Sequence, residues 1–135
     1  MNSEDPTRYQ TGLELRRRTL GAEYVDSALA HATELTQPFQ EFVTEYAWGA
    51  VWTRPGLPGA TRSLVTLAIL AALNQREELK LHLEAALLNG CQPAEIRETL
   101  FQVGLYAGLP AAVAGFGITQ QVLDAANPSG GDITE

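Results

Sequence analysis

The stretch TRSLVTLAILAALNQREELKLHLEAALLNG, residues 61–90, decides the fold class of this chain. Its first half, from Thr61 to Leu73, is apolar on nearly all sides of a helix, which is typical of a protein interior or a subunit interface. The run is too long and too rich in alanine for a buried strand. A turn around Asn74 and Gln75 leads to a second helix, and Asn89-Gly90 is a strong signal for its end.

Helical periodicity extends upstream of this stretch. Pro6 to Gly21 predicts a first helix, and a short second helix is expected around Tyr24 to Ala30. A third is expected from Thr36, as the N-cap, up to Pro55, because the residue before a proline avoids the helical region. Its buried face is predicted from apolar residues that recur at spacings of three and four, which are Phe39, Phe42, Val43, Tyr46, Ala47, Ala50 and Val51.

Downstream, a helix is predicted from Pro93, with a buried stripe formed by Ile96, Leu100, Val103 and Tyr106. Gly108 and Pro110 break it, and a last helix is expected to end near Ala126. No strand is predicted. The sequence therefore indicates an all-α fold of about six to seven helices, in one domain over residues 1–126. An acidic Gly/Ser-rich tail, residues 127–135, is expected to be disordered.

Composition narrows the function classes. The net charge of −7 argues against nucleic acid or an anionic membrane as a partner. The longest nearly apolar run, Leu64 to Leu73, is too short to span a bilayer, and the N-terminus lacks the pattern of a signal peptide. The single cysteine, Cys91, is interpreted as a small apolar residue and fits a reducing cytoplasm. We expect a cytoplasmic homo-oligomer, because so apolar a central helix usually needs a partner to cover it.

His82 is the first candidate for chemistry. Glu78 precedes it by four residues, so both side chains lie on one face of a helix, where the carboxylate can fix the tautomer and raise the pKa of the imidazole. The alternative is an ordinary Glu–His pair on a helix surface. A metal site needs at least three ligands, and the other histidine, His31, lies in a polar stretch and is interpreted as a surface residue.

Two arginines flank the turn WTRPGLPGATRSL, residues 52–64. Arg62 lies at the N-terminal end of the apolar helix, where the helix dipole disfavours a cation, so Arg62 is a candidate for binding an anion. The alternative is a solvated loop arginine. Trp48 and Trp52 are one helical turn apart, and such aromatics fill a core or an interface more often than they line a pocket.

Five segments in order carry a family resemblance: RYQTGLELRRRTLG, FQEFVTEYAWGAVWTRPGL, TRSLVTLAILAAL, EELKLHLEAALLNG and EIRETLFQVGLYAGLPAA. Over about residues 8 to 123 the chain resembles the carboxymuconolactone decarboxylase family, whose fold is of the alkylhydroperoxidase-D type. The WGAVWTRPGL and RSL stretches are specific to the subgroup that acts on 4-carboxymuconolactone. The spacing from His82 to Gly90 and the EIRE segment are shared by the wider family.

The resemblance implies decarboxylation of 4-carboxymuconolactone to 3-oxoadipate enol-lactone, in the protocatechuate branch of the β-ketoadipate pathway. It implies no cofactor and a hexameric or trimer-based assembly. His82, oriented by Glu78, is the expected proton donor or hydrogen-bond donor. Arg54 and Arg62 are expected to bind the substrate's carboxylates, and an apolar pocket is expected to have Trp48 or Trp52 as a wall.

Two positions separate this chain from relatives of the same fold. The thiol-dependent peroxidases of the wider family have cysteines where this chain has Gln75 and Glu78, so it lacks the thiols that such a redox reaction needs. An asparagine is expected where this chain has Val113, and a valine cannot replace the hydrogen bonds of an amide. A same-fold enzyme acting on a different lactone or keto-acid, and a non-catalytic helical assembly protein, are therefore the alternatives.

Overall fold

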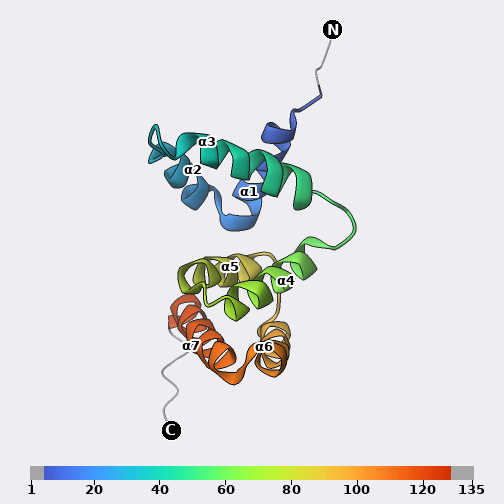
Figure 1. The fold of residues 1–135 in the computed structure, drawn as a ribbon, viewed down its shortest axis with the longest axis vertical. Coiled ribbons are helices and arrows are strands. Elements are labelled where there is room, and N and C mark those ends of the chain that lie inside the picture. Colours follow the sequence, from blue (N-terminus) through green and yellow to red (C-terminus); the bar gives the residue numbers. More distant parts are fainter. Residues whose placement is uncertain (1–4, 129–135) are drawn as a thin grey trace. The chain divides into compact units, whose positions relative to one another are not determined.

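The computed structural model describes residues 5–128, and among these it contains seven α-helices, one π-helix and no strand (Figure 1). The all-α prediction is confirmed. The chain divides into two compact units, Met1–Gly59 and Ala60–Glu135. Of the predicted tail, residues 129–135 lie outside the described residues.

The first unit contains α1 (Arg8–Leu20), α2 (Ala22–Ala30), α3 (Gln37–Phe42) and the π-helix η1 (Val43–Val51). Thr7 caps α1 through a capping box with Gln10, in which each side chain accepts a hydrogen bond from the other residue's backbone N–H. The first two predicted helices are confirmed. His31 ends α2 on the exposed surface, as predicted, with its Nδ1 atom 2.8 Å from the Ser27 carbonyl oxygen.

The third predicted helix continues from α3 into a π-helix, in which the backbone N–H bonds to the carbonyl five residues earlier. The bond from the Trp52 N–H to the Ala47 carbonyl, 3.0 Å long, shows this pattern at its end. α1 packs against η1 through two glycines. A Cβ atom at Gly12 would collide with the Thr44 carbonyl oxygen, and one at Gly49 would collide with the Arg8 carbonyl oxygen.

This contact corrects the predicted buried face. Phe39, Phe42, Tyr46 and Val51 are exposed, and the buried residues of the segment are Thr44 and Trp48. The face that carries Thr44 was missed because a 3.6-residue period scores threonine as polar, whereas α1 supplies it with a polar partner, as described below. Thr36 takes the N-cap position but its side chain does not cap α3. Its Oγ1 instead accepts a hydrogen bond from the Thr33 N–H.

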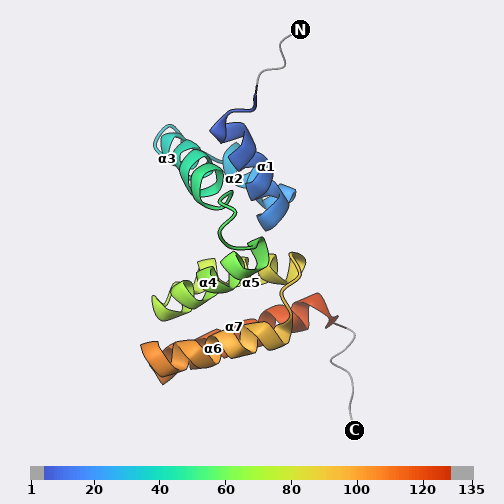
Figure 2. The same ribbon diagram turned by 90° about the vertical axis from the view of Figure 1, so that its right-hand side faces the viewer.

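The second unit contains α4 (Gly59–Ala72), α5 (Arg76–Leu88), α6 (Pro93–Ala107) and α7 (Leu109–Ala126). Figure 2 shows these four helices packed together, and all four contribute residues to one apolar core. Its buried members are Leu67, Ala71, Leu79, Leu83, Ala86, Cys91, Ile96, Leu100, Val103 and Val122. The predicted helix ends near Gly90 and Ala126 are confirmed.

A sharp turn at Gly108, with φ of +111°, joins α6 to α7 in a helical hairpin. The predicted buried stripe of α6 is correct for Ile96, Leu100 and Val103 and wrong for Tyr106, which is 80% exposed. Tyr106 lies in the last turn before Gly108, and α7 covers the neighbouring side of α6, where Gly104 meets Ala112.

Cys91 is buried in this core, and its thiol donates a hydrogen bond of 3.3 Å to the Ala60 carbonyl. Burial, and to a smaller extent the negative charge of Glu95, raises the pKa of the thiol. The thiol is therefore protonated at neutral pH, in keeping with a packing role. Within residues 5–128 there is no helix with both the length and the apolar character that a membrane crossing requires.

Candidate active site

His82 lies in the middle of α5, on the edge of the face that carries the core residues Leu79, Leu83 and Ala86. Only 12% of its side chain is exposed. Glu78, one turn earlier, is 57% exposed, and its Oε2 atom is 3.9 Å from the Nε2 atom of His82. The predicted pairing on one helix face is thus present, as an electrostatic contact too long for a hydrogen bond.

The pKa of His82 is lower than that of a free histidine. Burial is the larger cause, because removal from water disfavours the charged imidazolium, and the charge of Glu78 opposes it. Glu78 does raise the pKa of His82, as expected, but burial outweighs this contribution and the net pKa is lowered. The Glu78 carboxylate is more than half exposed, so water screens its charge. His82 is neutral at pH 7 and has one ring nitrogen that donates and one that accepts.

Arg62 lies in the first turn of α4, as predicted, and is half-buried with its Nε atom shielded from water. The Thr66 hydroxyl donates a hydrogen bond of 2.9 Å to the carbonyl oxygen of Arg62. α4 and α5 are consecutive helices joined by residues 73–75, and both contribute to the same apolar core (Figure 1). The structure therefore places Arg62, Glu78 and His82 on two consecutive helices of the second unit.

The other three predicted residues belong to the first unit. Trp48 is buried in η1, and its ring stacks on that of Trp52 with a centroid distance of 4.5 Å and an interplanar angle of 21°. Arg54 is exposed in the loop after η1, and its backbone N–H bonds to the Val51 carbonyl. Three of the six candidates thus lie in each unit, and the contacts among them include those of Trp48 with Trp52 and of Glu78 with His82.

Sequence reasoning missed a buried cation in the first unit. Arg16 is only 5% exposed, and its Nη1 donates to the Gln40 Oε1 at 3.0 Å and to the Thr44 Oγ1 at 3.1 Å. The Thr44 hydroxyl in turn donates to the Gln40 carbonyl. One signal was available, because Arg16 lies four residues after the buried Gly12 and so on the same face of α1.

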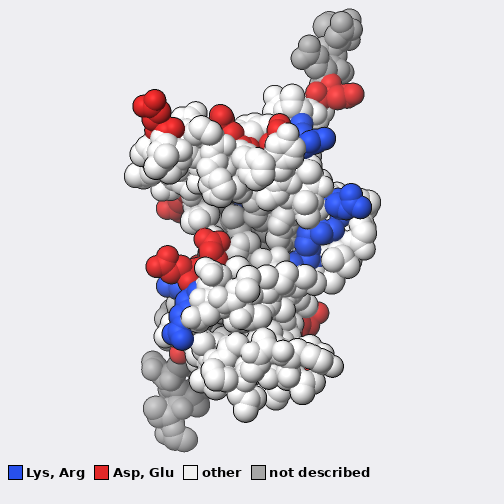
Figure 3. Space-filling view, viewed as in Figure 1, with Lys and Arg blue, Asp and Glu red and all other residues white. Residues whose placement is uncertain are grey.

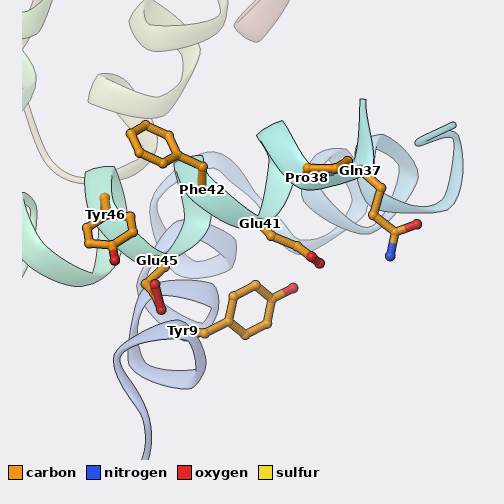
Figure 4. A pocket seen from close by; sticks show the side chains of 7 residues that line it. All are labelled: Tyr9, Gln37, Pro38, Glu41, Phe42, Glu45 and Tyr46. Atoms are coloured by element: carbon orange, nitrogen blue, oxygen red, sulfur yellow. The ribbon is translucent and has the colours of Figure 1, made fainter. Parts of the chain in front are cut away.

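The first unit also has a hollow of about 640 Å³ between α1 and the α3–η1 segment (Figure 4). Its lining residues are Tyr9, Gln37, Pro38, Glu41, Phe42, Glu45 and Tyr46. Tyr9 and Glu41 point into the same space from opposite elements (Figure 4). Two carboxylates without a lining cation would repel a dianionic substrate, so this hollow is not a site for the implied lactone. Among residues 5–128, no three His, Cys, Asp or Glu side chains are grouped as a metal site would require.

Comparison with known proteins identifies the class. The model of the carboxymuconolactone decarboxylase family matches residues 37–121, and the chain belongs to this family. The resemblance inferred from the sequence is thereby confirmed.

The chain is also similar over much of its length to individual proteins of known name. The chain is 45% identical over 118 residues to the 4-carboxymuconolactone decarboxylase of Acinetobacter baylyi, covering 87% of this chain and 88% of that protein. It is 40% identical over 116 residues to the nitrosuccinic acid decarboxylase of Metarhizium robertsii, covering 86% and 81%. An uncharacterized 15.0 kDa protein of Paracoccus denitrificans is 34% identical over 80 residues, 58% of this chain and 60% of that protein.

Proposed function

We propose that this chain is a carboxy-lyase that converts 4-carboxymuconolactone to 3-oxoadipate enol-lactone in the β-ketoadipate pathway. The observation that carries the proposal is the 45% identity with a 4-carboxymuconolactone decarboxylase over nearly the whole of both chains. The WGAVWTRPGL and RSL segments, at residues 48–57 and 62–64, resemble those of the subgroup that acts on 4-carboxymuconolactone.

The substrate's own structure explains how the reaction proceeds without a cofactor. When the bond to the departing carboxylate breaks, its electron pair delocalises through the ring double bond onto the lactone carbonyl. CO2 leaves, and a dienolate remains until a proton is added to carbon. The protein must bind two carboxylates, stabilise the charge on the carbonyl oxygen and manage the proton.

His82 is the residue proposed to stabilise the negative charge on the carbonyl oxygen. The lowered pKa of its imidazole favours the neutral form, which suits a hydrogen-bond donor to the carbonyl oxygen as negative charge develops there. A partly buried position also limits competing water, which strengthens such a bond. Glu78 is proposed to bias the orientation and the pKa of the ring.

Arg62 is the proposed ligand of a substrate carboxylate. A guanidinium suits a carboxylate because two parallel N–H groups meet two oxygens, and the N-terminal turn of α4 adds positive potential. Arg54 remains a predicted ligand of the second carboxylate. Trp48 and Trp52 remain predicted pocket walls, and the expected asparagine position, Val113, is 70% exposed on α7.

A second candidate substrate follows from the 40% identity with a nitrosuccinic acid decarboxylase. Nitrosuccinate, like the lactone, has two carboxylates and an electron-withdrawing group that can accept the electron pair left by CO2. The same Arg62 and His82 roles would serve it, with a nitro oxygen in place of the lactone carbonyl oxygen.

The test is turnover of both compounds, followed by the absorbance change of enzymatically generated 4-carboxymuconolactone and by CO2 release from nitrosuccinate. We expect the wild type to turn over the lactone, and His82→Ala to lower kcat by about 10²–10⁴. His31→Ala is the matched control, because His31 is an exposed histidine of the other unit. Full kcat in His82→Ala overturns the role of His82, faster turnover of nitrosuccinate favours the second candidate, and no turnover of either favours a non-catalytic assembly protein.

The proposal also covers the oligomeric state of the protein, its cellular location and its small-molecule partner. The family resemblance and the apolar surface of the second unit support a homo-oligomer, either hexameric or trimer-based. The single cysteine fits a cytoplasmic location, and the similarity to a 4-carboxymuconolactone decarboxylase supports a small-molecule lactone dicarboxylate as the partner. Sedimentation of the purified protein and fractionation of the producing cells test the first two statements.

A further inference from the structure

The α6–α7 hairpin of the second unit presents an apolar hollow of about 410 Å³. Its floor is made of the buried residues Leu100, Gly104 and Ala112. Its rim is made of five exposed apolar side chains, of which Phe116 is the least exposed, and we call them the hairpin face: Phe101, Leu105, Leu109, Val113 and Phe116. Leu105, Leu109 and Val113 are each at least 70% exposed.

The hairpin face is built into the fold by small residues. A Cβ atom at Gly104 would lie 3.1 Å from the Cβ of Ala112, so the two helices approach closely there and leave a depression between larger neighbours. On one side of the hollow Phe101 and Phe116 meet edge to face, with ring centroids 5.9 Å apart. The patch is therefore a shaped surface, with a depression beside protruding leucines.

The hairpin face lies in a segment of the sequence that contains no charged residue. From Thr99 to Leu123 the sequence contains no Asp, Glu, Lys or Arg, although the whole chain carries a net charge of −7. In the space-filling view white surface predominates over the visible part of α6 and α7 (Figure 3). Charged residues are depleted and aromatic residues enriched at the centres of protein interfaces. Two copies of an acidic chain repel one another least when they meet through an uncharged patch.

The size and the chemistry of the face select its occupant. Its five exposed side chains present roughly 500 Å², which is more than half of the roughly 800 Å² that each partner contributes to a standard interface. A dicarboxylate would find no cation in the hollow. A basic partner would be drawn to the acidic surfaces elsewhere on the chain, because opposite charges steer association.

We propose that the hairpin face is where a second copy of this chain docks, hairpin against hairpin about a two-fold axis. Such an isologous contact requires one patch to carry both a depression and the group that fills it. The hairpin face carries both, with the Gly104–Ala112 depression facing Leu105 or Leu109 of the other copy. This inference rests on the homo-oligomer proposed above and not on the identity of the substrate.

The experiment is sedimentation velocity on Leu105→Glu and Val113→Glu, with circular dichroism to verify the helical content. Both side chains are exposed, so the monomer is expected to fold. Each variant is expected to reduce the assembly mass at least two-fold, toward the 14.6 kDa of one chain, because it buries like charges against one another across the axis. Leu35→Glu adds the same charge at an 87% exposed residue of the first unit and should leave the mass unchanged.

A second exposed apolar surface of the same unit is tested for comparison. The outer side of α4 carries Val65 and Ile69, which are also about half exposed. The proposal is overturned if the wild type sediments as a monomer, if both hairpin variants keep the wild-type mass, or if Ile69→Glu alone dissociates the assembly. Lactone turnover is measured on the same samples. Failure of the proposed activity would appear as a wild type that assembles but is inactive, whereas failure of the docking proposal would appear in the sedimentation data alone.

Discussion

The Nε2 atom of His82 lies 3.9 Å from the Oε2 atom of Glu78, and burial outweighs this carboxylate in setting the pKa of the imidazole. Glu78→Gln removes the influence that raises the pKa and leaves the desolvation in place. The pKa of His82 is therefore expected to fall further below its wild-type value. An NMR titration of the His82 ring protons measures this directly. Glu77→Gln, at the adjacent and exposed position in the same helical turn, should leave that pKa close to the wild-type value.

Stability should depend on pH through the same group. The unfolded state binds a proton at His82 near pH 6.5, whereas the folded state binds it only at a lower pH. Between those two values the unfolded state holds more protons, so the free energy of unfolding falls as the pH is lowered through this window. Above about pH 6.5 His82 is neutral in both states, so it makes no contribution to the pH dependence of the free energy of unfolding. Urea unfolding at a series of pH values should show a shallower acid loss for His82→Asn than for the wild type, and parallel curves would contradict the burial of a neutral imidazole.

Arg62 gives a prediction about substrate binding. Arg62→Gln removes the proposed carboxylate ligand, and the loss of charged hydrogen bonds should raise KM for 4-carboxymuconolactone by about 10- to 100-fold. Steady-state kinetics at fixed ionic strength measure it. The control is Arg97→Gln, because Arg97 is exposed on α6 beside Glu98, at 3.2 Å, and such surface pairs contribute little. An unchanged KM for Arg62→Gln would remove Arg62 from the site.

Most of the second unit could be predicted from the sequence because its helices follow local rules. Gly90 and Gly108 end α5 and α6 with positive φ, and the core residues Leu67, Leu83 and Ile96 fall at helical spacings. Tyr106 was misplaced because periodicity continues through the last helical turn, where the neighbouring helix no longer covers it.

The first unit could not be predicted as well, because its packing depends on long-range contacts. Nothing local in residues 43–51 distinguishes a π-helix from an α-helix. Arg16 is buried where Gln40 and Thr44, 24 and 28 residues away, accept hydrogen bonds from its Nη1 atom. In the candidate site the Glu78–His82 pair follows from helix geometry, whereas the net direction of the pKa shift depends on burial, which a spacing of four residues does not encode.

The buried Arg16 should be important for the stability of the first unit. Arg16→Met keeps much of the side-chain volume and removes the hydrogen bonds to Gln40 and Thr44. The free energy of unfolding is expected to fall by about 1.5–3 kcal/mol, because these bonds come from a charged donor in a buried place. Arg18→Met is the control, since Arg18 is exposed and lies 4.0 Å from Glu14. Equal stability of the two variants in urea would show that Arg16 is not a structural link to η1.

Two glycines with opposite surroundings give the last prediction. Gly12→Ala places a methyl group against the Thr44 carbonyl and 2.7 Å from the Gly49 nitrogen, so α1 and η1 must separate. Overpacking of this kind costs about 1–3 kcal/mol, and here backbone rather than a flexible side chain is in the way. Gly117→Ala, in the interior of α7, meets no atom within 4 Å and should stabilise the protein by about 0.5–1 kcal/mol, because alanine favours a helix more than glycine does. Thermal unfolding of the two variants should therefore shift in opposite directions, and a stabilising Gly12→Ala would mean that α1 and η1 do not pack backbone to backbone.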